Sequence, residues 1–222
     1  MNPPDVWVGW PTVSPSQSQE MVRWWRAMGY KVAVLIDDPA QPDVLKGLLE
    51  TLQAADRVIV QREWLGFPCA ANVLCREAPG DIVVVVGDDV YPDPHVGAQE
   101  IGCQFVEQFP DLFGVMQPTG DKFASIHLCA VSPWIGRGFI QKAYEGKGPY
   151  WGGYWHYFSD QELQEKAVQL GVFQQREDLT QYHDHWQRKA VPQRPRHLLK
   201  AKRLWAQDKA LFDQRQKEGF PG

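Results

Sequence analysis

The sequence predicts an α/β fold in which helices flank a central, mostly parallel sheet. In the first half of the 222-residue chain, short apolar segments typical of strands alternate with longer segments of helical periodicity. Residues Ile82 to Val86 form a run of five β-branched side chains, which fits a strand covered on both faces. These two observations favour a doubly wound sheet with this strand near its centre.

In the first half, strands and helices are expected to alternate, beginning with a strand. The first helix should be capped by Ser16 or Ser18 and should end at Gly29. Asp37-Asp38-Pro39 should stop the second strand. The expected strands are Val6–Trp10, Lys31–Ile36, Arg57–Gln61 and Asp81–Val86, and the further helices are Asp43–Ala54 and Pro68–Glu77.

The second half is less regular. The glycine- and aromatic-rich stretch from Gly146 to Tyr157 cannot form a regular helix and is expected to face a substrate. Ser159 is expected to cap a helix over Asp160–Leu170, with Glu162 at the capping-box position. The other expected elements are a helix at Gln99–Gln108, strands at Phe113–Gln117 and Ile126–Val131, and a helical tail at Arg194–Lys217.

Composition is that of a soluble globular protein, with 44% hydrophobic and 23% charged residues. The four cysteines lack zinc-binding spacing, so we expect reduced thiols in a cytoplasmic protein. The first residues do not resemble a secretory signal, and the longest apolar run is too short to cross a bilayer. Aromatic residues reach 12%, so some rings are expected to line a ligand groove while others fill the core.

Charge is distributed unevenly along the chain. Residues 188–218 carry a formal charge of +7, whereas the rest of the chain carries −11. We therefore expect a main domain over residues 1–187 and a basic, mainly helical extension over residues 188–222. Such an extension suits an acidic partner, either nucleic acid or an anionic surface, although a solvated basic helix would have the same composition.

The strongest chemical signal is Gly87-Asp88-Asp89, directly after the most buried strand. Ligands of open α/β sheets bind at the carboxyl ends of the strands. Two adjacent carboxylates repel each other unless a cation lies between them and a ligand, and a hard divalent ion bound to a diphosphate would supply that cation. An acidic turn is the alternative interpretation, because the residues from Asp88 to Pro92 also suit a turn.

Two weaker signals accompany this pair. Asp37 and Asp38 end the second strand and should lie at the same edge of the sheet, where either could bind a nucleobase or ribose. His183 and His185 in the sequence Tyr-His-Asp-His face the same way on a strand, a spacing that suits metal or phosphate binding. A turn-forming Asp and ordinary surface histidines are the alternatives.

The order of these motifs resembles the inverting family 2 glycosyltransferases, which have the GT-A fold. The resemblance covers roughly residues 6–186. Its motifs are short, and it is their order and spacing that match. They are Pro11-Thr12 after a strand, Asp37-Asp38, Ala70-Ala71-Asn72 before Gly80-Asp81, the VVVVGDDVYPDP segment, FSDQEL from Phe158, and YHDH from Tyr182. One departure is that the acidic triplet reads Asp88-Asp89-Val90 in this chain.

The resemblance implies a role for each matched position. Asp89 would be the principal ligand of Mn²⁺ or Mg²⁺, and His183 or His185 would complete the metal shell. Asp160 would be the general base, with Glu162 as its competitor. Asp88 would touch the metal or the donor ribose, and the remaining donor-binding candidates are Pro11, Thr12, Asp37, Asp38 and Asn72. The aromatic candidates for covering the sugar or acceptor are Tyr150, Trp151, Tyr154 and Trp155.

The resemblance implies transfer of a sugar from a nucleotide-sugar, with UDP-sugar expected, to an acceptor hydroxyl. Small glycosyltransferases of this kind are encoded by bacteriophages, and some modify hydroxymethylated pyrimidines in DNA. Lys200, Lys202 and Arg203 would then bind the phosphates of double-stranded DNA. The alternatives are a polysaccharide or lipid-linked acceptor, a nucleotidyltransferase, or a non-catalytic nucleic-acid-binding protein. Walker, GxGxxG and GxSxG motifs are absent, which disfavours kinases, dehydrogenases and serine hydrolases.

Overall fold

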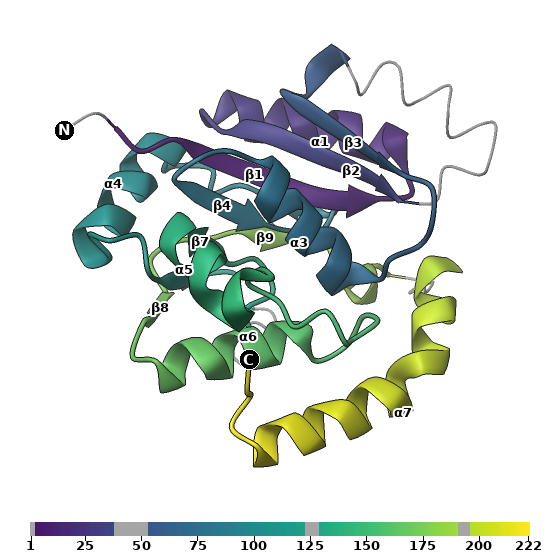
Figure 1. The fold of residues 1–222 in the computed structure, drawn as a ribbon. Helices are drawn as coiled ribbons and strands as arrows, with labels where there is room; N and C mark the ends of the chain where they lie inside the picture. Colours follow the sequence, from purple (N-terminus) through teal and green to yellow (C-terminus); the bar gives the residue numbers. More distant parts are fainter. Residues whose placement is uncertain (1–2, 38–52, 123–128, 191–195) are drawn as a thin grey trace.

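A computed structural model of the chain describes residues 3–37, 53–122, 129–190 and 196–222. Within these residues, seven strands form one sheet in the order β3-β2-β1-β4-β7-β6-β8, shown in Figure 1. Neighbours pair in parallel except where β7 lies between β4 and β6. The strands are β1 (Val6–Thr12), β2 (Lys31–Asp37), β3 (Arg57–Gln61), β4 (Ile82–Val85), β6 (Val115–Pro118), β7 (Trp134–Gly136) and β8 (Phe173–Arg176).

Helices cover both faces of this sheet, as the sequence predicts. On one face α1 (Pro15–Ala27) and α4 (Ala98–Gln108) share a core with Val8, Trp10 and Val84. On the other face α3 (Phe67–Glu77), α5 (Arg137–Lys142) and α6 (Ser159–Gln169) pack on the residues that alternate with these. Gly9 permits the close approach of α3, because a Cβ there would lie 3.1 Å from a Leu74 methyl carbon. Within the described residues, the central strands β1, β2 and β4 are therefore covered on both faces, whereas the outer strand β3 remains partly exposed.

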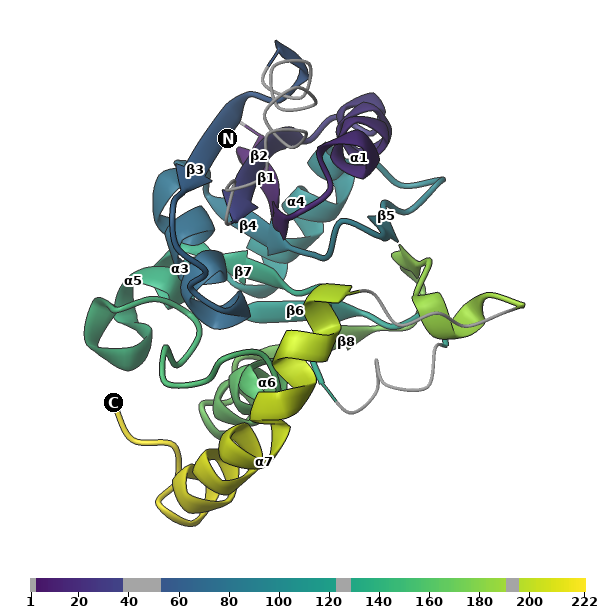
Figure 2. The same ribbon diagram turned by 90° about the vertical axis from the view of Figure 1, so that its right-hand side faces the viewer.

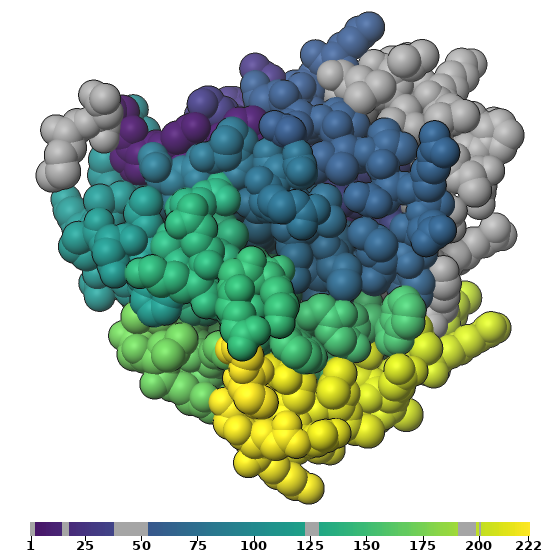
Figure 3. Space-filling view, in the orientation of Figure 1, coloured from purple at the N-terminus to yellow at the C-terminus, as the bar shows by residue number. Residues whose placement is uncertain are grey.

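The C-terminal helix α7 (Arg196–Lys217) lies along α6 at the bottom of Figure 1 and in front of it in Figure 2. In the space-filling view of Figure 3 it packs directly against the segment that follows β7. Its buried residues Ala201, Asp208, Phe212 and Arg215 belong to one face of the helix. The predicted helical extension exists, and it is packed against the rest of the chain. None of the described helices is long and apolar enough to span a bilayer.

The structure differs from the expected elements at several points. Ser18 lies inside α1, where its hydroxyl accepts a hydrogen bond from the Trp10 indole, and Ser14 precedes the helix without a side-chain cap. Phe158, with φ +69°, precedes α6, so Ser159 is the first helical residue and not its cap. Residues 129–131 form a bend, whereas the other residues of the expected strand at Ile126–Val131 lie outside the described residues. The same holds for most of the expected Asp43–Ala54 helix.

Candidate active site

The two carboxylates that follow β4 lie at the edge where the parallel strands end, the edge that faces the viewer in Figure 2. The hydroxyl of Thr12, at the end of β1 next to Pro11, donates a hydrogen bond of 2.7 Å to Oδ2 of Asp88. Asp37 ends the neighbouring strand β2 and is buried. Residues from three adjacent strands thus meet at one edge. Asp38 lies outside the described residues.

Of the two carboxylates, Asp88 is the one that binds a proton more readily. Burial raises its pKa to about 6, and the neighbouring charge of Asp89 adds to this, although the hydrogen bond from Thr12 opposes it. The ionised form of a buried carboxylate is stabilised by any positive charge that approaches it. The pair can therefore serve as a cation-binding position at neutral pH.

Asp89 is joined to a distant part of the chain by a small second sheet. Strand β5 (Val90–Tyr91) pairs antiparallel with β9 (Tyr182–His183), with Val90 opposite His183. This register brings Nε2 of His183 to 3.2 Å from Oδ1 of Asp89. Burial pushes the pKa of Asp89 upward, but the hydrogen bond and charge of His183, followed by the charge of His185, hold it below its usual value.

The two histidines therefore occupy different positions. His183 contacts Asp89, whereas the His185 ring lies 5.0 Å from the His183 ring. Burial and the neighbouring His183 lower the pKa of His185. The backbone N–H of His183 is also bound by Asp121, which forms an ion pair with Arg188 at 2.6 Å. Asp121 was not predicted, because it is 62 positions from His183 and no local motif marks it.

These residues fit a divalent cation that takes part of its coordination from a bound ligand. Among the described residues, no group of three or more His, Cys, Asp or Glu side chains is arranged to hold a metal ion by itself. Mg²⁺ and Mn²⁺ commonly use one or two carboxylates together with substrate phosphates. Asp89, in contact with His183, and the adjacent Asp88 supply one or two carboxylates of this kind at the ends of the strands.

Asp160 is the second residue of α6 and is partly exposed. Burial is the main cause of the raised pKa of the Cys129 thiol. The charge of the Asp160 carboxylate and its hydrogen bond with the thiol raise that pKa further. Cys129 belongs to the segment that enters β7, and the carbonyl of Pro133 in that segment accepts a hydrogen bond from Val85 at the end of β4. The chain thus brings the start of α6 toward the strand end that precedes Asp88.

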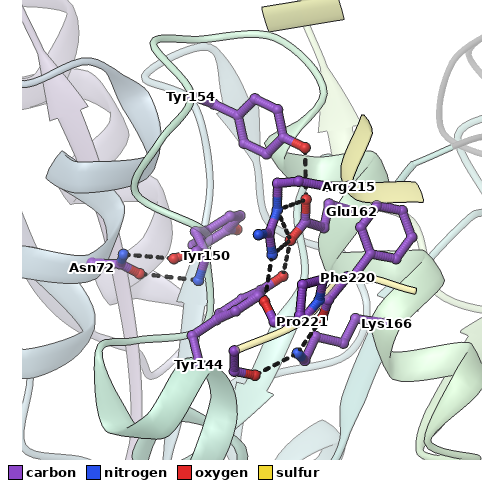
Figure 4. A network of polar contacts seen from close by, with 10 residues as sticks. Asn72, Tyr144, Tyr150, Tyr154, Glu162, Lys166, Arg215, Phe220 and Pro221 are labelled. Atoms are coloured by element: carbon purple, nitrogen blue, oxygen red, sulfur yellow. Dashed lines mark hydrogen bonds and ion pairs between the residues drawn. The ribbon is translucent and has the colours of Figure 1, made fainter. Parts of the chain in front are cut away.

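Glu162 lies in a different environment from Asp160. Its carboxylate is fully buried and accepts hydrogen bonds from Nε and a terminal nitrogen of Arg215 on α7, at 2.8 to 3.1 Å. The hydroxyls of Tyr144 and Tyr154 donate to the same carboxylate at 2.7 and 2.6 Å, as Figure 4 shows. With hydrogen bonds from four donor groups and no exposure, Glu162 fixes α7 to α6 and is not available to an acceptor.

The aromatic candidates divide into buried and partly exposed rings. Tyr150 and Tyr154 are buried, so they pack in the interior instead of covering a ligand. Asn72, a donor-binding candidate, has both ends of its amide bonded to the Tyr150 backbone, at 2.8 and 3.0 Å (Figure 4). Trp151 packs against the Arg215 guanidinium at 3.8 Å. Trp155 is partly exposed and stacks on Trp64, which the sequence analysis did not identify.

The basic candidates of the C-terminal helix are exposed where they are described. Lys202 and Arg203 lie on the solvent side of α7, near the exposed Trp205. The side chain of Lys200 lies outside the described part of the chain.

Comparison with known proteins bears on the fold. No protein-family profile matches the sequence, and no curated protein matches it. Among solved structures, the mannosyltransferase PcManGT from Pyrobaculum calidifontis, in complex with GDP-Man and Mn²⁺, matches with a TM-score of 0.63 and 17% identity, over 90% of this chain and 61% of its own. TarS from S. aureus in complex with UDP matches with a TM-score of 0.56 and 14% identity, over 80% of this chain and 59% of its own.

The chain has the GT-A fold. The TarS complex with UDP-GlcNAc matches equally well, with a TM-score of 0.56 and 14% identity over 88% of this chain and 60% of its own. The chain spans about three fifths of the length of these solved structures. The predicted α/β fold class, with a mostly parallel sheet between helices, is therefore confirmed.

The raised pKa of Asp88 predicts a pH-dependent effect on stability. Its folded-state pKa of about 6 exceeds the unfolded value, so its unfavourable contribution is absent below about pH 4 and develops as the pH rises through 6. Asp88→Asn should therefore increase the free energy of unfolding by about 1–3 kcal/mol at pH 7.5 and leave it unchanged at pH 4. Urea denaturation with EDTA present, at both pH values, measures this.

The matched control for that experiment is Glu107→Gln, which removes one negative charge from the exposed side of α4. It should leave stability nearly unchanged at both pH values, because a solvated charge contributes little. Equal stabilisation by the two substitutions would contradict a desolvated Asp88. An increase in the free energy of unfolding by Asp88→Asn that is already complete at pH 4 would contradict it as well.

Proposed function

We propose that this chain is a metal-dependent glycosyltransferase that moves a sugar from a nucleotide-sugar to an acceptor hydroxyl. The observation that carries the proposal is the contact of His183 with Asp89 at the carboxyl ends of the strands of a GT-A sheet, next to Asp88, which Thr12 holds by a hydrogen bond. The solved structures that share the fold include complexes with GDP-Man and Mn²⁺, with UDP and with UDP-GlcNAc.

On the donor side, the chain's residues bind and orient the leaving group. Asp88, Asp89 and His183 would hold Mn²⁺ or Mg²⁺, which when bound neutralises the charge that develops on the departing nucleoside diphosphate. Thr12 keeps Asp88 pointed at this position. The buried Asp37, at the end of the adjacent strand, is suited to accept hydrogen bonds from the nucleoside, for which we propose uridine.

On the acceptor side, Asp160 is the group proposed to accept the proton of the attacking hydroxyl. It is partly exposed and stands at the first turn of α6, where the helix N-terminus favours the charged carboxylate. Direct displacement at the anomeric carbon needs such a base, since the hydroxyl oxygen must lose its proton as its bond to the sugar forms. Glu162 is excluded from this role by its burial and its ion pair with Arg215.

For the acceptor, the hypothesis retained from the sequence is a hydroxymethylated pyrimidine in duplex DNA of a bacteriophage. Exposed Lys202 and Arg203 at the start of α7 support it, because basic side chains suit the phosphates of DNA. A polysaccharide or lipid-linked acceptor is the alternative, and Trp205, exposed on the same helix, would suit it equally.

The metal dependence can be tested on donor binding alone. UDP should bind more tightly with Mn²⁺ than with EDTA, and Asp89→Asn should abolish this difference. Isothermal titration calorimetry measures the two affinities, with Asp178→Asn, an exposed aspartate paired with Arg176, as the control. Equal affinity of the unaltered chain for UDP with and without Mn²⁺ would refute the metal-bridged donor site.

The assignment of the base can be tested with a pair of neighbouring variants. Asp160→Asn should retain donor affinity and stability but reduce transfer by roughly 10²–10⁴-fold, since that is the usual contribution of a general base. Glu162→Gln should lower the free energy of unfolding by about 3–5 kcal/mol, because it leaves Arg215 buried without a counter-charge. Transfer assays and urea denaturation distinguish the two. A stable Glu162→Gln protein with lost transfer would reverse the assignment.

The DNA hypothesis predicts a salt-dependent affinity. Each phosphate contact contributes a slope of about −0.9 in a plot of log affinity against log salt on duplex DNA. Replacing Lys202 and Arg203 by Ala should therefore flatten the slope by roughly two units, whereas Arg76→Ala on the exposed side of α3 should not change it. Fluorescence anisotropy with hydroxymethylated duplex at several salt concentrations measures this. An unchanged slope would favour a carbohydrate or lipid-linked acceptor.

A further inference from the structure

The carboxylate of Asp208, on the buried face of α7, is completely enclosed. It accepts hydrogen bonds from three consecutive backbone N–H groups, those of Trp155, His156 and Tyr157, at 3.0, 2.9 and 2.9 Å. Within the described ranges no lysine or arginine forms an ion pair with it. The negative charge is therefore stabilised by aligned backbone dipoles, an arrangement that needs both oxygens of a carboxylate.

The three residues held by Asp208 are bound on their other side to the start of α3. The carbonyl of Trp155 accepts a hydrogen bond from the Phe67 N–H over 2.9 Å. Gly66, with φ +77°, permits this approach, because a Cβ there would lie 2.4 Å from the Trp155 carbonyl oxygen. The segment from Trp155 to Tyr157 is thus clamped between two helices that are far apart in sequence.

This clamp fixes two features of the proposed acceptor side. The indole of Trp155 stacks on that of Trp64, with centroids 5.3 Å apart and planes at 9°. Immediately after the clamped segment, Phe158 adopts a left-handed backbone and α6 begins, so Asp160 is three residues beyond Tyr157. The position of the proposed base therefore depends on where Asp208 holds the preceding turn.

Arg215 reinforces the same arrangement from the next part of the helix. It lies seven residues after Asp208, two turns along the same face of α7, and pairs with Glu162 in α6. One face of α7 thus holds both the turn before α6 and α6 itself.

We propose that Asp208 is a positioning residue that sets the acceptor half of the site, acting through the turn at Trp155–Tyr157 on the paired indoles and on Asp160. The inference rests on the proposed glycosyl transfer for its catalytic consequence, but its structural part can be tested without any substrate. Asp208 itself touches neither donor nor acceptor, and the donor residues at the ends of β1 and β4 are held by other contacts.

The first test is optical. Two stacked indoles give an exciton-coupled circular dichroism signal. Trp64→Phe should remove this signal, and the difference from the unaltered chain identifies the part of the spectrum that the indole pair contributes. Asp208→Asn should reduce the same signal, because an amide in place of the carboxylate cannot accept all three N–H groups. The control is Asp213→Asn on the same helix, where the carboxylate only pairs with the partly exposed Lys209. An Asp208→Asn protein that is folded and retains the full signal would overturn the proposal.

The second test gives a result even if the Asp208→Asn variant does not fold. In the unaltered chain, hydrogen exchange at the amides of Trp155, His156 and Tyr157 should be as slow as at the helical amides of α7, because all three are bound to Asp208. In Asp208→Asn, where it folds, these amides should exchange roughly 10- to 100-fold faster. Rapid exchange in the unaltered chain would overturn the clamp directly.

The third test separates positioning from a general loss of structure. Asp208→Asn should reduce transfer by roughly 10²-fold through kcat and the acceptor KM, as expected when a base is displaced by about 1 Å, and should leave donor affinity unchanged. A parallel loss of donor affinity would overturn the assignment to the acceptor half. If the unaltered chain shows no transfer with any donor, the proposed function fails, whereas the optical and exchange results still decide the role of Asp208.

Discussion

Two negative charges are held side by side at the end of the most enclosed strand of the sheet, and much of the surrounding structure accommodates them. Burial makes ionisation of Asp88 costly, while the contact with His183 favours ionisation of Asp89. The pKa values of the two neighbours are therefore shifted in opposite directions. The hydroxyl of Thr12 and the short β5–β9 ribbon are the contacts that keep this pair in place. A ribbon with two residues in each strand has little stability of its own. It persists because Val90 is buried in the core beside it.

The fold was largely predictable because its signals are local. Strand β3 occupies the expected Arg57–Gln61, and β1, β2, β4, α3 and α4 begin and end within a few residues of the predicted bounds. These elements are recognised in the sequence by their hydrophobic periodicity and by Gly and Pro at their ends. Strands β7 and β8 were missed because they contain only three and four residues, too few for alternation to be distinguished from a loop.

The site was predictable only in part, for a related reason. Asp88 and Asp89 are marked by their position after a buried strand, and the contact of His183 with Asp89 agrees with the motif that singled it out. Glu162 satisfied the helix-start pattern equally well, but its environment is determined by Arg215, 53 positions later. Long-range pairing of this kind leaves no trace in local spacing. Asp208 and Trp64 were missed on the same grounds, since their partners lie in other elements.

Helix α7 follows in sequence the elements on which it packs, and this imposes an order on folding. The parallel half of the sheet is built from neighbouring strands and helices, so it can form while synthesis continues. Before residues 208–215 have left the ribosome, the Glu162 carboxylate has the hydroxyls of Tyr144 and Tyr154 but not the Arg215 guanidinium, and the amides of Trp155 to Tyr157 lack the Asp208 carboxylate. Until then the Glu162 carboxylate has no cationic partner. The nascent chain would therefore pass through a stage with a formed donor half and an open acceptor half, a state that chaperones and proteases recognise.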